Sequence, residues 1–141
     1  MIEIVSGARI LRVSPFERQN TPEAPEYDWI RTYIEYNLPE LNTQYQASFN
    51  SGELTDLKQK INYMHQSLLN GIKPSDVNFD SMENQLNIHF IPMTDNSVAV
   101  ELTLRPENPA ESVIIKDFFG IDESYFPALL SGLDEMIHWQ N

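Results

Sequence analysis

Short stretches in which apolar and polar residues alternate predict β-strands in the first half of the chain. Ile2 and Ile4 alternate, and an apolar run at 10–13 follows Ser6-Gly7, so the start predicts a hairpin. Residues 29–36 alternate next, and Tyr45, Ala47 and Phe49 form a further set that Asn50-Ser51-Gly52 ends. We therefore expect antiparallel strands before the first helix.

A helix is predicted over residues 54–68, where apolar side chains recur at spacings of three and four residues. Asn70-Gly71, with Pro74 beyond, is a suitable C-terminal stop. The stripe consists of Leu54, Leu57, Ile61, Met64 and Leu68. Such a stripe needs an apolar surface to cover it.

The second half predicts a three-stranded antiparallel meander. Residues 86–90 and 98–104 alternate on either side of an Asp95-Asn96 turn, and 113–116 is expected to be the third strand. If the turn joins strands with all apolar residues on one face, Phe90 lies opposite Val100, and His89 lies opposite Glu101 on the other face.

A second helix closes the chain. Ser124 is the expected N-cap, which places Pro127 in the first turn, where a missing N–H is tolerated. Its buried stripe is formed by Phe126, Leu129, Leu130, Leu133, Met136 and Ile137. Gly132 lies within this helix, which indicates either close packing against a neighbour or tolerance in a short helix.

These elements predict an α+β fold: a curved antiparallel β-sheet with two helices packed on one face. Residues 14–28 contain three prolines and are predicted to form a loop within the domain. The length of 141 residues favours one domain over 1–141. An exposed edge of the sheet would be compatible with dimerisation, and the oligomeric state stays open.

The net charge of the chain limits the classes of partner that it can bind. The chain has 21 Asp and Glu against nine Lys and Arg, a formal net charge of −12. Such a protein repels nucleic acid and anionic membranes and attracts basic proteins. Two interpretations stay open: the acids serve solubility, or they form a surface that captures a basic protein partner. For the second, the candidate partner-binding residues are Glu23, Glu26, Asp28, Glu35 and Glu101.

The sequence contains no pattern that predicts a cofactor or metal site. The chain has no cysteine, which excludes disulfides and thiolate zinc sites, and its three histidines lack metal-ligand spacing. No glycine-rich phosphate loop occurs either. We expect no cofactor and no metal. No secretory signal and no apolar run of membrane-spanning length is visible, so we expect a cytoplasmic protein.

The expected His89–Glu101 pair has two interpretations. It is either an exposed cross-strand pair or the acid/base pair of a small enzyme. The enzyme hypothesis predicts a cleft around His89, whereas the structural interpretation predicts an open, solvated strand.

Two groups of segments carry a resemblance to a known family. In the first half they are Asp28-Trp29-Ile30-x-Thr32-x-Ile34, Tyr45-x-Ala47-x-Phe49 and Glu53-Leu54-x-x-Leu57-x-x-x-Ile61. In the second half they are Leu86-Asn-Ile-His-Phe90, Val98-x-Val-x-Leu-x-Leu104 and Leu129-x-x-x-Leu133. Together these segments resemble the WapI-type immunity proteins of bacterial polymorphic or contact-dependent toxin systems, and the resemblance covers residues 1–138 in element order.

This resemblance implies a cytoplasmic bacterial protein without catalytic residues that neutralises a cognate toxin domain. Contact positions vary with the toxin in this family, so the resemblance transfers none. Many such toxins are basic nucleases, which an acidic inhibitor suits. The first hypothesis is thus a non-catalytic immunity protein that binds a basic toxin domain. The alternatives are an accessory protein–protein interaction module of another pathway, or a small enzyme using His89 and Glu101.

Overall fold

The computed structural model describes residues 1–107 and 113–141. This part of the chain contains two antiparallel four-stranded sheets and two helices, which confirms the α+β class. Sheet A consists of β1 (Ile2–Ser6), β2 (Arg9–Gln19), β3 (Trp29–Leu38) and β4 (Leu41–Asn50). Sheet B consists of β5 (Val77–Asp80), β6 (Leu86–Pro92), β7 (Ser97–Leu104) and β8 (Ile115–Asp122). The strands thus divide between two sheets where the sequence pattern suggested one.

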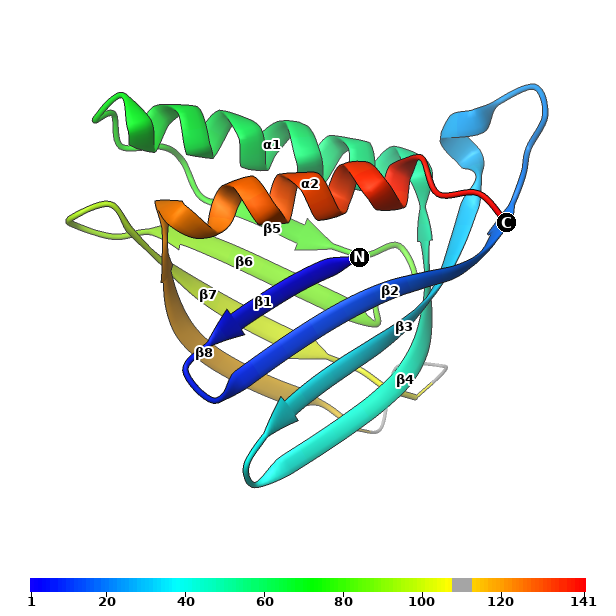
Figure 1. The fold of residues 1–141 in the computed structure, drawn as a ribbon, viewed down its shortest axis with the longest axis horizontal. Coiled ribbons are helices and arrows are strands. Elements are labelled where there is room, and N and C mark those ends of the chain that lie inside the picture. Colours follow the sequence, from blue (N-terminus) through cyan, green and yellow to red (C-terminus); the bar gives the residue numbers. More distant parts are fainter. Residues whose placement is uncertain (108–112) are drawn as a thin grey trace.

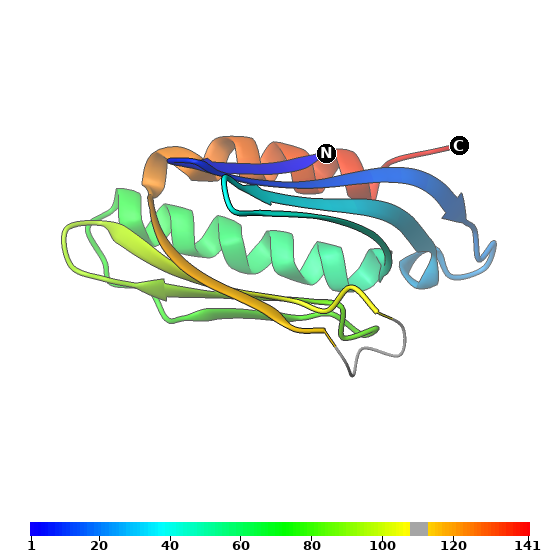
Figure 2. The ribbon, with the colours of Figure 1, turned by 90° about the horizontal axis from the view of Figure 1, so that it is seen from below.

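The two sheets face each other, and the helices close one end of the space between them. Figure 1 shows α1 (Ser51–Leu69) and α2 (Phe126–Ile137) side by side, and Figure 2 shows the sheets as two layers. Helix α1 contacts α2, β4 and β5, and α2 contacts β1. The inner faces of both sheets and the apolar stripes of both helices form one hydrophobic core. Neither of the two described helices lies on the outer face of a sheet (Figure 1, Figure 2).

The predicted N-terminal hairpin is confirmed, since Ile4 pairs with Leu11 across β1 and β2. Strand β2 continues to Gln19, so the loop predicted over 14–28 begins six residues too early. A β-bulge between Pro15 and Glu17 lets the strand pass a proline, which has no N–H for the ladder. The short 3₁₀ turn η1 (Pro25–Tyr27) then leads into β3.

Helix α1 begins directly after β4. The Asn50 side chain accepts from the Gly52 N–H at 2.9 Å, and Glu53 Oε2 accepts from the Asn50 N–H at 2.8 Å, which closes a capping box. The predicted stripe is confirmed, because all five of its members are buried in the core.

Sheet B has the predicted register between β6 and β7, with Phe90 opposite Val100 and His89 opposite Glu101. Its third paired strand was placed wrongly: β8 is Ile115–Asp122, not 113–116. Gly120 lies within this strand, opposite Ala99. The edge strand β5 was not predicted.

Helix α2 starts one residue later than the predicted Ser124 cap would place it. Asp122 accepts instead from the Ser124 N–H at 2.9 Å, and the 3₁₀ turn η2 (Glu123–Tyr125) precedes the helix. Pro127 is the second residue of α2. Gly132 packs closely against β1: a Cβ there would lie 2.4 Å from the Met1 carbonyl oxygen. Close packing, rather than tolerance, explains this glycine.

Candidate protein-binding surface

Internal ion pairs take up most of the positive charge. Among the described residues, six of the nine Lys and Arg side chains lie within 4.0 Å of a carboxylate. These six are Arg9, Arg12, Arg18, Arg31, Lys58 and Lys60. Few unpaired Lys or Arg side chains therefore remain to balance the acidic side chains at the surface.

Asp28, one of the expected contact residues, is buried and belongs to the interior. Its side chain is 5% exposed, and its Oδ2 lies 2.8 Å from Nη2 of Arg18. The Thr21 N–H donates to Oδ1 at 2.5 Å. That bond, aided by Arg18, holds the pKa of Asp28 below its ordinary value against the effect of burial. Asp28 is therefore not a surface contact, and a carboxylate with these partners has a structural role.

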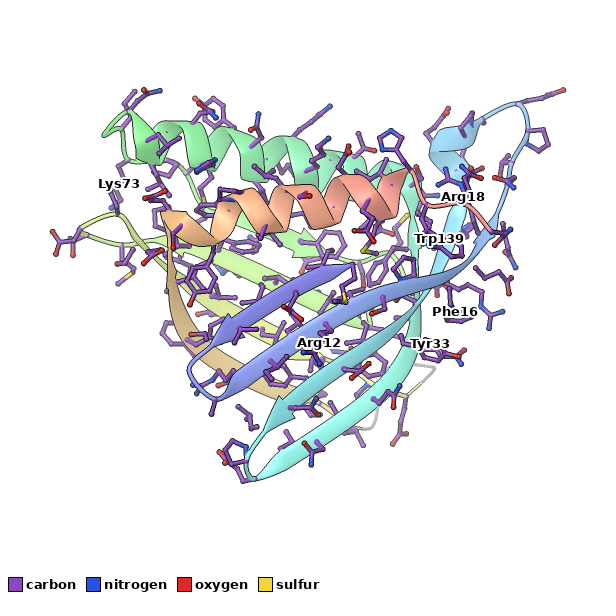
Figure 3. All side chains as sticks on the ribbon, in the orientation of Figure 1. Arg12, Phe16, Arg18, Tyr33, Lys73 and Trp139 are labelled. Atoms are coloured by element: carbon purple, nitrogen blue, oxygen red, sulfur yellow. The ribbon has the colours of Figure 1, made fainter. Side chains whose placement is uncertain are left out.

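Arg18 connects this carboxylate to the end of α2. Its Nη1 donates to the carbonyl of Ile137, the last residue of α2, at 2.7 Å and to that of Trp139 beyond the helix at 3.0 Å. The side chain of Asn141 pairs with the backbone N–H and C=O of Arg18 at 2.8 and 2.9 Å. Figure 3 shows Arg18 and Trp139 at the same end of the molecule.

The other expected contact residues do not gather at one place. Glu23 and Glu26 are exposed in the connection between β2 and β3. Glu35 is half-buried on the outer face of sheet A, in the same cross-strand row as Arg12. Glu101 is exposed on the outer face of sheet B. A single acidic surface cannot include all of them.

The predicted His89–Glu101 contact is present, with a partner that sequence reasoning missed. His89 Nδ1 lies 3.3 Å from Glu101, and Nε2 lies 2.9 Å from Asp76, just before β5. The two carboxylates lie at opposite ring nitrogens and do not converge on one point. Among the described residues, no group of three His, Asp or Glu side chains is placed to hold a metal ion.

The outer face of sheet B also exposes an aromatic ring. The pairing of β6, β7 and β8 aligns His89, Glu101 and Phe118 in one cross-strand row. Phe118 is 59% exposed. We call Asp76, Asp80, His89, Glu101 and Phe118 the Phe118 surface. The Phe118-Phe119 doublet was the available signal in the sequence, because neighbouring strand residues face opposite sides.

Two shallow hollows flank the middle of this surface. One, of about 460 Å³, extends from Glu101 and Thr103 to Phe118. The other, of about 250 Å³, lies between Asp80, His89 and Arg105 and shares Glu101 and Thr103 with the first. Both are open to solvent and hold charged groups beside carbon. Such a surface fits protruding side chains of a partner better than a small buried substrate.

Behind Phe118, the inward-facing Asp117 connects the two sheets. Its carboxylate accepts from Nε of Arg9 in β2 at 2.6 Å and from the hydroxyl of Tyr36 in β3. Burial raises the pKa of Asp117, but the bonds from Arg9 and Tyr36 outweigh it and the net shift is downward. Burial, together with Asp117, raises the pKa of Tyr36. This network fixes β8, and with it Phe118, against sheet A.

Within residues 1–107 and 113–141, no helix combines the length and the hydrophobicity that crossing a bilayer requires.

Comparison with protein families gives one assignment. The model described as "Immunity protein WapI-like family" matches residues 1–141. A search among curated proteins finds no match.

Solved structures include proteins with a similar arrangement of elements. "Structure of the plant transcriptional regulator PBF-2" is 11% identical, with a TM-score of 0.50 over 96% of this chain and 78% of that one. WHY1 from Arabidopsis thaliana is 15% identical, with a TM-score of 0.48 over 97% of this chain and 90% of that one. At such identity, the first of these shows likeness of fold alone.

Proposed function

The chain belongs to the WapI-like immunity protein family, and on this premise we propose that it neutralises a cognate bacterial toxin domain by binding it directly, without catalysis. In this proposal the partner is a basic toxin domain and the encounter takes place in the cytoplasm. The family match over residues 1–141 is the observation that carries the proposal.

Charge supports a basic partner. The net charge is −12, and six of nine cations are already paired within the molecule. Complementary charge accelerates association with a cationic surface and rejects acidic competitors. The same charge disfavours a nucleic acid, because phosphate contacts require clustered Lys and Arg. The plant neighbour PBF-2 is described as a transcriptional regulator.

The surroundings of His89 support a binding role over an acid/base role. The ring lies on an uncovered sheet face, and both of its nitrogens are close to carboxylates, Asp76 at 2.9 Å and Glu101 at 3.3 Å. This arrangement ties the start of β5 to β7 across the intervening strand. A general base needs a nitrogen free to meet a substrate proton, and here neither nitrogen is unoccupied.

Co-expression tests the proposal. The toxin domain encoded by the neighbouring gene is produced in a bacterial host with or without this protein, and an unrelated toxin domain is the control. We expect growth to be rescued only for the cognate pair, and a tagged copy of this protein to retain the toxin domain through purification. Growth arrest that persists despite soluble expression of both proteins would refute the proposed function.

A further inference from the structure

The outer faces of the two sheets differ in how their charges are satisfied. On sheet A, Arg12 lies 2.6 Å from Glu3, and Arg31 lies 3.3 Å from Glu17. The aromatic rings on that face also pack on each other, since Phe16 stacks on Tyr33 with ring centroids 4.4 Å apart. Figure 3 labels both residues. Sheet A therefore offers a partner few unsatisfied groups.

On sheet B the acids of the Phe118 surface have no such partners. Among the described residues, neither Asp76, Asp80 nor Glu101 lies within 4.0 Å of a Lys or Arg group. Asp76 and Glu101 instead hold His89 between them. Arg105 and Lys116 line the hollows on this face. Neither lies within 4.0 Å of these acids in the described part of the chain, so the acids stay available to cations from outside.

Phe118, on the edge strand β8 directly opposite Glu101, adds an apolar contact point at one side of this charge. Gly120 follows it on the same face, and a Cβ at Gly120 would meet nothing within 4 Å. One side of the Phe118 ring is thus open, and the larger hollow lies on the side of Thr103 and Lys116. An exposed ring with room around it, next to acids, resembles the anchor of a protein interface, where aromatic residues dominate the binding energy.

Resting on the proposed function, we propose that the Phe118 surface is where the toxin domain docks. A basic segment of the toxin lies across β6, β7 and β8 and places an apolar side chain against Phe118. Its Lys or Arg groups face Glu101, Asp76 and Asp80. The occupant is thus a cationic protein surface rather than a second copy of this chain, because a second copy would bring the same acids into contact.

Two matched pairs of variants test this assignment. Phe118→Thr, which keeps a strand-forming residue, is compared with Tyr27→Thr, since Tyr27 is equally exposed at 62% but lies in the β2–β3 connection. Glu101→Lys is compared with Glu35→Lys, since both acids project from a central strand, one on each sheet. Circular dichroism and the melting temperature establish that each variant is folded, and Phe118→Ala provides a second ring deletion.

Binding to the toxin domain from the neighbouring gene is then measured for each variant. We expect Phe118→Thr and Phe118→Ala to weaken affinity about 30-fold or more, and Glu101→Lys to slow association about 10-fold at low salt. Tyr27→Thr and Glu35→Lys should bind like the wild type. Loss of binding in the controls with none in the Phe118 variants would overturn this docking surface while leaving the immunity function standing. Absence of wild-type binding would refute the function itself.

Discussion

Arg18 is the residue on which the C-terminal end of the fold depends. It pairs with a buried carboxylate and donates to the carbonyls of Ile137 at the end of α2 and Trp139 beyond it. The side chain of Asn141 binds its backbone N–H and C=O. Asp28, which belongs to one of the segments that carry the family resemblance, therefore has a structural role. A buried acid next to a buried arginine holds segments together, and neither group remains available to a partner.

Acid should weaken this arrangement. A carboxylate whose pKa is lowered by folding adds stability above its unfolded value, and the gain is lost as pH falls through the folded value. The pKa of Asp28 is lowered from 3.8, chiefly by the Thr21 N–H. Asp28→Asn should destabilise the protein at neutral pH, and the difference from wild type should shrink below about pH 4. Urea unfolding near pH 7 and pH 3 measures it, and an unchanged difference would contradict the assignment.

For a substitution of Gly132 by alanine, the structure predicts a loss of stability, whereas helix propensity alone predicts a gain. Gly132→Ala in an unconstrained helix would stabilise by about 1 kcal/mol. Here the new Cβ would lie 2.4 Å from the Met1 carbonyl oxygen and 3.1 Å from the Ile2 Cα, both backbone atoms of the N-terminal segment. We expect a net loss of about 1–3 kcal/mol in the free energy of unfolding. A variant as stable as the wild type would show that the N-terminal segment can move away from α2 without loss of stability.

At the scale of elements, the capping box couples β4 to α1. Asn50→Ala removes the side chain that accepts from Gly52 N–H and should cost about 0.5–2 kcal/mol. Asn62→Ala is the matched control, because Asn62 is exposed in the middle of the same helix and alanine favours a helix there. Chemical denaturation of both variants measures the difference. Equal stability of the two would show that the box contributes nothing.

The sequence pattern predicts elements well where burial alternates cleanly. In β3, Ile30, Thr32, Ile34 and Tyr36 are all fully buried as expected. Strand β8 was misplaced because the usual pattern is inverted at its centre. The polar Asp117 faces inward to Arg9 and Tyr36, while the apolar Phe118 faces outward. Strand β5 is only four residues long, too short for periodicity to reveal.

The sequence predicts only part of the Phe118 surface. The register of β6 and β7 places Glu101 next to His89, and the structure confirms it. Asp76 and Phe118 were missed because they flank or belong to the two strands that were missed or misplaced. The division into two sheets depends on contacts far apart in sequence, such as Tyr45 with the carbonyl of Gln85 at 2.7 Å, which no local pattern encodes.

For the whole molecule, the excess of 12 negative charges makes association sensitive to salt. The association rate with the toxin domain should fall at least about 10-fold between about 0.05 M and about 0.5 M NaCl, because screening shortens the range of attraction. Stopped-flow or surface-based kinetics measures it. A rate independent of salt would mean that the charge serves solubility and does not steer the encounter.

Neutralisation by direct binding is tested most directly by titration. The activity of the purified toxin domain is followed while this protein is added in increasing amounts. The proposed function predicts that activity falls in proportion to the added protein and is abolished once the toxin is saturated, with a matching complex on size-exclusion chromatography. Toxin activity that stays unchanged with this protein in excess would contradict it.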